Sequence, residues 1–260
     1  MREPAIRAAL RDGAPVLGAW LQLNDAFSAE LLASVGFDWL LVDMEHGPIP
    51  FEAAASIVTA VRTTHCTPFV RPAWNEASHI QRALDLGCSG IIVPVVNSAE
   101  DARRVVVDAR FPPLGERSRG GLRPTLAFGT DAMTYFERAN TSLIVLVQIE
   151  TQKAIDDVDE IVAVDGVDGI FLGPNDLAAS HAKRWPDVWE KDAAYMDAVA
   201  RAAASARGAG KIAGFLARDA AMVKRSAELG YNFIGVSSDV NYLAGAARTA
   251  LTASREALGR

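Results

Sequence analysis

The chain has 260 residues, of which 50% are hydrophobic and 22% are charged, and its formal net charge at pH 7 is −6. This length suits one α/β barrel better than two small domains, and the apolar content excludes a disordered chain. No run of basic residues stands out, which argues against a nucleic-acid partner because phosphate binding needs clustered lysine and arginine.

The N-terminal segment, residues 1–13, has no apolar core of the kind that a secretory signal carries. No later apolar stretch approaches the length of a membrane span. The two cysteines, Cys66 and Cys88, form no CxxC or metal-finger pattern, so we expect reduced thiols. These features predict a cytoplasmic protein without a membrane partner.

Short apolar runs alternate along the chain with amphipathic segments and with glycine or proline breaks. The runs do not alternate with polar residues, which is typical of strands buried on both faces of a parallel sheet. They span residues 16–23, 38–44, 67–72, 89–96, 142–149, 168–173, 211–216 and 232–238. This pattern predicts a single (β/α)8 barrel domain over residues 1–260. A doubly wound Rossmann-type sheet is the alternative, but no GxGxxG follows any run.

The first segment between runs, residues 25–35, is expected to be a helix that Asn24 caps and that stops at Gly36. Its large apolar side chains fall on one face: Phe27, Leu31 and Val35.

Later segments carry similar helix patterns. Residues 51–62 align four apolar side chains: Ala54, Ile57, Val58 and Val61. Ser98 followed by Asp101 predicts a capping box, and Asp219 is expected to cap a helix that ends at Gly230.

Two connections are long, residues 111–141 and residues 178–210. The first is expected to be a loop rich in Pro, Gly and Arg, and the second to contain a long alanine-rich helix. Long connections in a barrel commonly cover or complete a site. A last helix is expected from about residue 240, with three apolar side chains: Leu243, Ala247 and Leu251.

Polar residues follow most of the predicted strands. In barrel enzymes the active site lies at the C-terminal ends of the strands, so these residues are expected to converge on one rim. They are Asp43, Glu45, His46, Arg71, Gln148, Glu150, Asn175, Asp176 and Asp239.

Glu150 and Asp176 follow neighbouring strands and have no paired histidine or cysteine. Two such carboxylates suit a hard cation such as Mg2+ or Mn2+ and leave positions open for water and a chelating substrate. The alternative is that each carboxylate caps the helix that follows it. Their convergence at adjacent strand ends favours the metal site.

His46 follows a predicted strand beside two acidic residues, which makes it a candidate acid/base; the alternative is a loop histidine bonded to the backbone. Arg71 ends a buried strand and must therefore find an anion. That anion is either a negative charge that develops on the substrate or a structural partner, Asp43 or Glu45.

Lysine is found only at positions 153, 183, 191, 211 and 224, and none of these ends a predicted strand. A Schiff-base aldolase needs a lysine there. No glycine-rich phosphate cradle follows the last two strands, which argues against a sugar-phosphate substrate.

With these motifs in view, the chain resembles the HpcH/HpaI aldolase family of metal-dependent pyruvate aldolases. The matching stretches run in order along nearly the whole chain: residues 36–48, 70–76, 83–96, 109–118, 147–151, 167–177 and 236–239. The resemblance implies a lyase that reversibly cleaves a 4-hydroxy-2-oxo acid to pyruvate, or hydroxypyruvate, and an aldehyde.

The resemblance also assigns roles to individual residues. It implies that Glu150 and Asp176 bind the metal ion, with Co2+ or Zn2+ also accepted. It implies that Arg71 stabilises an enolate and that His46 is the acid/base, with Asp85 raising its basicity. The remaining residues implied to contact substrate are Gln148, Gly173, Pro174, Asn175 and Asp176 at the 2-oxo acid, and Trp20 and Leu216 at the aldehyde.

The family resemblance further implies a homohexamer in which the last helix packs on a neighbouring subunit. Position 175 is Asn, where other members mostly carry Ala or Ser, and this leaves the choice of 2-oxo acid open. Two other functions stay possible: an acyl-CoA lyase of the malyl- or citramalyl-CoA type, or a non-catalytic barrel. The acyl-CoA lyase would want a basic patch for the nucleotide, and the sequence shows none.

Overall fold

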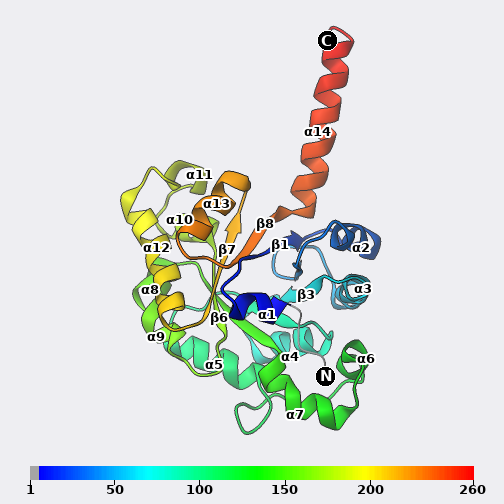
Figure 1. The fold of residues 1–260 in the computed structure, drawn as a ribbon, viewed down its shortest axis with the longest axis vertical. Coiled ribbons are helices and arrows are strands. Elements are labelled where there is room, and N and C mark those ends of the chain that lie inside the picture. Colours follow the sequence, from blue (N-terminus) through cyan, green and yellow to red (C-terminus); the bar gives the residue numbers. More distant parts are fainter. Residues whose placement is uncertain (1–5) are drawn as a thin grey trace.

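The computed structural model describes residues 6–260, so the first five residues of the segment tested for a secretory signal lie outside the described residues. Eight parallel strands pair in sequence order and close into a barrel, which confirms the predicted fold class (Figure 1). Each strand lies within or almost within a predicted run. The strands are β1 (Val16–Leu21), β2 (Trp39–Asp43), β3 (Thr67–Arg71), β4 (Gly90–Val93), β5 (Ile144–Ile149), β6 (Gly169–Leu172), β7 (Ile212–Ala217) and β8 (Phe233–Ser238).

Helices connect the strands on the outside of the barrel (Figure 1). In chain order they are α1 (Ile6–Arg11), α2 (Ala26–Ser34), α3 (Phe51–Arg62), α4 (Ala77–Asp85), α5 (Ala99–Ala109), α6 (Arg123–Phe128), α7 (Ala132–Ser142), α8 (Gln152–Asp156), α9 (Val158–Val162), α10 (Pro174–Ser180), α11 (Trp185–Val188), α12 (Ala193–Gly208), α13 (Ala220–Glu228) and α14 (Asp239–Ala257).

Aromatic side chains fill the inside of the barrel. The rings of Trp39 and Phe233 stack with their centroids 4.1 Å apart, and Phe69 and Phe171 pack around them. Gly18 is required beside them, because a Cβ at this position would lie 2.0 Å from the Trp39 ring. Strand residues are thus buried against this interior or against the helices, which explains the unbroken apolar runs.

The predicted helix ends are mostly confirmed. Ser98 accepts a hydrogen bond from the Asp101 backbone at the start of α5, and Asp219 does the same from Met222 at the start of α13. The prediction that Asn24 caps α2 is wrong. Asp25 is the cap, because its carboxylate accepts the Ser28 backbone N–H.

Helix α2 presents its large apolar side chains to solvent rather than to the barrel. Phe27, Leu31 and Val35 are all more than half exposed, while Ala29 and Ala33 are buried. The small alanine side chains allow the helix to lie close to its neighbours. The outer face of α2 is therefore an apolar surface.

The prediction that residues 111–141 form one long loop is wrong, because this connection contains α6 and most of α7. In the connection over residues 178–210, the expected long alanine-rich helix is α12. The two connections lie on different sides of the barrel: α6 and α7 are at the lower right of Figure 1, whereas α10, α11 and α12 are at its left.

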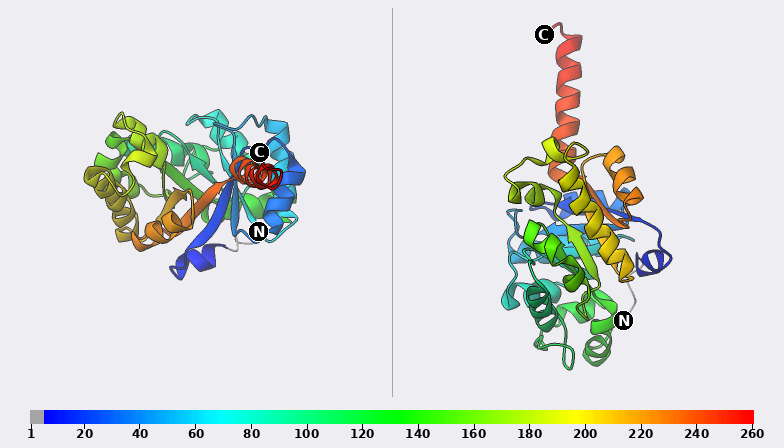
Figure 2. Two further views of the ribbon diagram at one scale, coloured as in Figure 1. Left: turned by 90° about the horizontal axis from the view of Figure 1, so that it is seen from above. Right: turned by 90° about the vertical axis from the view of Figure 1, so that its left-hand side faces the viewer.

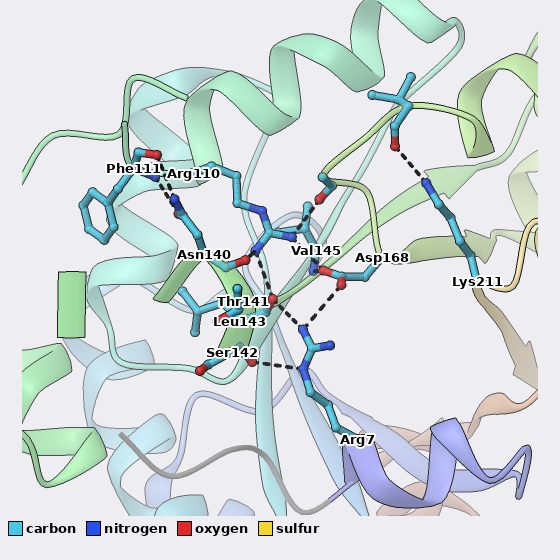
Figure 3. Close-up of polar contacts among 12 residues, drawn as sticks. Arg7, Arg110, Phe111, Asn140, Thr141, Ser142, Leu143, Val145, Asp168 and Lys211 are labelled. Atoms are coloured by element: carbon cyan, nitrogen blue, oxygen red, sulfur yellow. Dashed lines mark hydrogen bonds and ion pairs between the residues drawn. The ribbon is translucent and has the colours of Figure 1, made fainter. Parts of the chain in front are cut away.

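A polar network closes the N-terminal end of the barrel (Figure 3). The buried Arg110 side chain donates to Asp168 Oδ2 at 2.7 Å, and this oxygen also accepts the Val145 backbone N–H at 2.8 Å. Arg7 of α1 reaches the other oxygen of Asp168 at 3.4 Å. These contacts join α1 and the end of α5 to the N-terminal ends of β5 and β6. The charged side chains here stabilise the fold, at the opposite end of the barrel from the C-terminal strand ends where the active site was expected.

Helix α14 projects from the barrel as a long arm, and it meets the other described residues near its start, at β1 and β8 (Figures 1 and 2). Its apolar side chains Leu243 and Leu251 are 62% and 51% exposed. The Tyr242 ring lies against Phe37, with ring centroids 6.3 Å apart, and so fixes the base of the arm. Within the described residues, no helix has the length and apolar content that a membrane span needs.

Candidate active site

A cavity of about 190 Å3 opens at the C-terminal ends of the strands. Its lining residues come from six strands or the turns that follow them: Trp20, Gln22, His46, Arg71, Gln148, Phe171, Gly173, Pro174, Asn175, Asp176 and Leu216. Every residue to which the family resemblance assigned a role lines this cavity except Glu150 and Asp85. Asp43, Glu45 and Asp239, which were also expected at this rim, do not line it. Convergence of strand ends in a closed barrel accounts for this grouping.

Arg71 lies at the end of β3 with its guanidinium almost completely buried. It donates to both carboxylate oxygens of Asp43, at 2.9 and 2.8 Å, and pairs with Glu45 at 2.8 Å. The guanidinium also stacks 4.2 Å from the centre of the Trp20 ring. Asp43 and Glu45, the two structural partners considered for Arg71, both pair with it, and the Arg71 side chain also lines the cavity.

Asp43 organises the end of β2. Besides the two bonds from Arg71, it accepts the Gln22 side-chain amide at 3.0 Å and the backbone N–H of His46 at 3.2 Å. Burial alone would raise the pKa of Asp43, but the bonds and charge of Arg71, with the Gln22 bond, lower it overall. Asp43 thus stays a carboxylate that fixes Arg71 and the turn bearing His46.

Glu150 follows β5 and is buried beside Gln148, a residue of the cavity lining. Its Oε1 accepts the Val95 backbone N–H at 2.8 Å, and its Oε2 accepts the Gln148 side-chain amide. Val95 adopts a φ of 57°, a conformation that is strained for a β-branched residue. Neighbouring Thr151, not Glu150, caps the next helix, so the capping alternative for Glu150 is wrong.

Asp176 lies in the first turn of α10, where no side chain forms a capping bond, so the capping alternative is wrong for Asp176 as well. Gly173, the residue before α10, is part of the cavity lining. A Cβ at Gly173 would lie 3.0 Å from Glu150 Oε2 and 3.0 Å from Gln148 Nε2. The absence of a side chain there leaves room around the Glu150 carboxylate.

The site carries more negative than positive charge. Asp43, Glu45, Glu150 and Asp176 act on one another electrostatically, and Arg71 is the cation paired with the first two. Burial, with the charges of Asp176 and Glu45, raises the pKa of Glu150 to about 7. A divalent cation between these oxygen donors would offset the excess negative charge and would favour the ionised form of Glu150. The residues present therefore fit a hard metal ion.

The protein would supply only some of the ligands of this metal ion and would leave coordination positions open. In the described part of the chain, no three His, Cys, Asp or Glu side chains are arranged to hold a metal ion together. Glu150 and Asp176 would therefore be two ligands, with water and substrate in the remaining positions, as magnesium sites commonly have.

His46 stands at the mouth of the cavity with its side chain 60% exposed. Its ring lies 4.0 Å from the carboxylate of Glu45. The exposed side chain of Asn175 also borders the cavity, and Leu216 contributes an apolar wall. A substrate that enters this opening therefore meets His46 and Asn175 before it reaches Arg71.

Comparison with known proteins shows which family this chain belongs to. The family model described as HpcH/HpaI aldolase/citrate lyase matches residues 17–246. The chain belongs to the HpcH/HpaI aldolase family. It is 38% identical to a 4-hydroxy-2-oxo-heptane-1,7-dioate aldolase from Shigella flexneri over 249 residues, 94% of this chain and 91% of that protein.

Solved structures agree with this placement in the HpcH/HpaI family. A family protein from Burkholderia cenocepacia J2315 is 35% identical, with a TM-score of 0.89 over 97% of this chain and 99% of that one. A citrate lyase from Burkholderia xenovorans LB400 is 16% identical, with a TM-score of 0.61 over 86% of this chain and 73% of that one. The second structure shares the fold alone.

One residue assigned through the HpcH/HpaI resemblance lies apart from the cavity. Asp85, at the end of α4, pairs with the buried side chain of Arg117 at 2.7 Å. Among the contacts of the described residues, none joins Asp85 to His46. The expectation that Asp85 raises the basicity of His46 therefore has no support within one subunit.

Sequence reasoning on this HpcH/HpaI member also missed contributors to the site. Gln22 and Phe171 line the cavity, and the backbone N–H of Val95 orients Glu150. Gln22 could have been found, because it is a polar residue within the first apolar run. A larger cavity, of about 520 Å3, lies at the opposite barrel end around Val16 and Cys66 and contains none of the predicted site residues.

Proposed function

We propose that the protein is a metal-dependent carbon–carbon lyase that reversibly cleaves a 4-hydroxy-2-oxo acid to pyruvate, or hydroxypyruvate, and an aldehyde. The observation that carries the proposal is the cavity lined by His46, Arg71 and Asp176, with Glu150 buried beside the lining residue Gln148 and close enough to feel the charge of Asp176. Membership of the HpcH/HpaI aldolase family and the aldolase named in the comparison support the same reaction class.

The size of the cavity favours a small substrate. At about 190 Å3 it is smaller than the range of roughly 300–1,000 Å3 typical of pockets for drug-sized ligands. An acyl-CoA substrate would have to leave its nucleotide outside. The small volume of the cavity therefore favours a short 2-oxo acid over the acyl-CoA alternative.

Arg71 would act on the negative charge that develops when the carbon–carbon bond breaks. Its guanidinium is buried and held by Asp43 and Glu45, so it needs no rearrangement during the reaction. In the cleavage direction, His46 would take the proton from the aldol hydroxyl at the mouth of the cavity. In condensation it would return that proton to the new hydroxyl oxygen.

The remaining residues would hold the substrate. Glu150 and Asp176 would bind the metal ion, Mg2+ or Mn2+ by preference, with Co2+ or Zn2+ as further possibilities. When bound, that ion supplies Lewis-acid stabilisation of the 2-oxo group. Gln148 and the Gly173–Asp176 segment would bind the 2-oxo acid end, and Trp20 and Leu216 would contact the aldehyde end.

The direct test of the function is pyruvate release from a panel of 4-hydroxy-2-oxo acids of different chain length, with Mg2+ or Mn2+ present. We expect turnover of at least one member. A protein that binds the metal and pyruvate yet cleaves none of the panel would instead support the non-catalytic alternative.

Removal of the metal is the first specific prediction. Treatment with EDTA should abolish pyruvate release, and added Mn2+ or Mg2+ should restore it. Borohydride in the presence of pyruvate should leave the enzyme active, because no lysine lines the cavity. Mass spectrometry that finds a reduced pyruvate adduct on a lysine would contradict the metal-dependent mechanism.

Assembly is the second prediction. The exposed apolar side chains of α14 and the outer face of α2 are surfaces that association would bury. We propose a homohexamer, as the family resemblance implies, in which α14 packs on a neighbouring subunit. Light scattering at micromolar concentration should give a hexamer, and truncation after Tyr242 should give smaller species. A monomeric wild-type protein would refute this.

A further inference from the structure

The junction between β8 and α14 is tied to the active-site end of β1 by one carboxylate. Asp239, the first residue of α14, is only 7% exposed. Its Oδ1 accepts the Gln22 backbone N–H at 2.9 Å, and its Oδ2 accepts the Leu23 backbone N–H at 3.0 Å. Both oxygens of a buried carboxylate are thus used to hold two successive peptide groups more than 200 residues away in sequence.

The residue that Asp239 holds is itself part of the site. The side-chain amide of Gln22 lines the cavity and donates to Asp43 Oδ2 at 3.0 Å. That same oxygen accepts Arg71 Nη2 at 2.8 Å. A continuous set of hydrogen bonds therefore runs from the start of α14 through Gln22 and Asp43 to the Arg71 guanidinium.

The surrounding backbone shows that this connection is locally demanding. The β1–β8 register shifts between Gly18 and Trp20, just before Gln22. On the other strand, Ser237 adopts a φ of 58°, which a non-glycine residue rarely takes. Strain of this kind persists where neighbouring contacts fix the chain, and Asp239 supplies such contacts two residues later.

We propose that Asp239 is a positioning residue of the active site, which holds the Gln22 backbone so that the Gln22 amide keeps Asp43 and Arg71 in their reactive arrangement. This inference rests on the proposed role of Arg71. Asp239 lies outside the cavity and acts only through Gln22. The alternative is that Asp239 merely starts α14, as an acidic residue in a first helical turn commonly does.

The test compares Asp239→Asn with a matched variant, Asp219→Asn. Asp219 stands at the start of the helix after β7, as Asp239 does after β8, and its carboxylate also accepts a backbone N–H, from Met222 at 2.9 Å. No hydrogen bond joins Asp219 to Gln22 in the described part of the chain. In Asp239→Asn one acceptor oxygen becomes an NH2 group that faces a backbone donor, so at least one of the two bonds is lost.

We expect Asp239→Asn to lower kcat for pyruvate release by about tenfold or more, with KM little changed, because the affected group acts on developing charge. Asp219→Asn should keep the wild-type kcat. A crystal structure of Asp239→Asn should show the Gln22 amide displaced from Asp43. This geometric result does not depend on the enzyme assay.

A double variant separates the positioning role from a general effect on α14 or assembly. Gln22→Ala removes the amide but leaves the backbone that Asp239 holds. If Asp239 acts through that amide, adding Asp239→Asn to Gln22→Ala should lower kcat no further. Additive losses, or equal effects of Asp239→Asn and Asp219→Asn, would overturn the inference. A wild-type protein inactive on the whole substrate panel would instead contradict the proposed function.

Discussion

Replacing Arg71 with alanine should lower kcat for pyruvate release by about a hundredfold or more. Loss of one preorganised charge contact at a developing anion commonly costs on the order of 3 kcal/mol in transition-state stabilisation. Arg71 is preorganised because Asp43 holds two of its nitrogens and Glu45 a third. The variant also leaves the buried Asp43 carboxylate without its cation, so thermal stability must be measured alongside kcat.

Arg71→Lys is the sharper variant because it keeps the charge. An ammonium group cannot reproduce the planar fork that contacts Asp43 and Glu45 together. We therefore expect this variant to fold and yet recover little activity. Recovery of most of the wild-type kcat would show that charge alone, and not the geometry of the guanidinium, is what the reaction uses.

A second reaction separates Arg71 from His46. Exchange of the methyl protons of pyruvate with solvent needs an enolate but no transfer of the aldol hydroxyl proton. Arg71→Ala should suppress both exchange and cleavage, whereas His46→Ala should suppress cleavage and leave more of the exchange. Normal exchange in Arg71→Ala would reduce Arg71 to a structural partner of Asp43 and Glu45. Equal loss of both reactions in His46→Ala would show that His46 also serves the methyl proton.

The barrel was predictable because its strands are buried on both sides. The run at 142–149 has no polar alternation, and the corresponding strand β5 is buried at every position. The order of elements then leaves few arrangements in a chain of this length. Helix orientation was harder to predict. In α2 the residues against the barrel are Ala29 and Ala33, whereas the large apolar side chains that suggested an inward face point outward.

The site was predictable where a residue ends a strand or follows it within a few residues. His46, Arg71 and Asp176 could be grouped from the sequence because parallel strands end at the same rim. Contacts that depend on side-chain direction could not. Asp85 has the same sequence neighbourhood whether it meets His46 or Arg117, and only the path of the segment after α5 brings Arg117 to it. The Val95 N–H likewise points at Glu150 because of a local backbone conformation.

The second large effect is expected at Gly173, where an added methyl group should disable the site without unfolding the protein. Gly173 has an ordinary extended conformation with φ −89°, so alanine fits the backbone. The Cβ, however, would lie 3.0 Å from both Glu150 Oε2 and Gln148 Nε2. Neither neighbour can move freely, since Glu150 is held by Val95 and Gln148 is bonded to Glu150.

We therefore expect Gly173→Ala to lower metal affinity and kcat by about tenfold to a hundredfold, the range seen when groups that orient metal ligands are disturbed. The measurements are Mn2+ titration by calorimetry and pyruvate release at saturating Mn2+. Gly208→Ala is the matched control, because a Cβ there meets nothing within 4 Å and the position lies at the end of α12. The control should keep both properties and match or exceed the wild-type thermal stability. If Gly173→Ala binds Mn2+ as tightly as the wild type, the Glu150 carboxylate is not the ligand proposed here, and its burial beside Gln148 has a structural purpose instead.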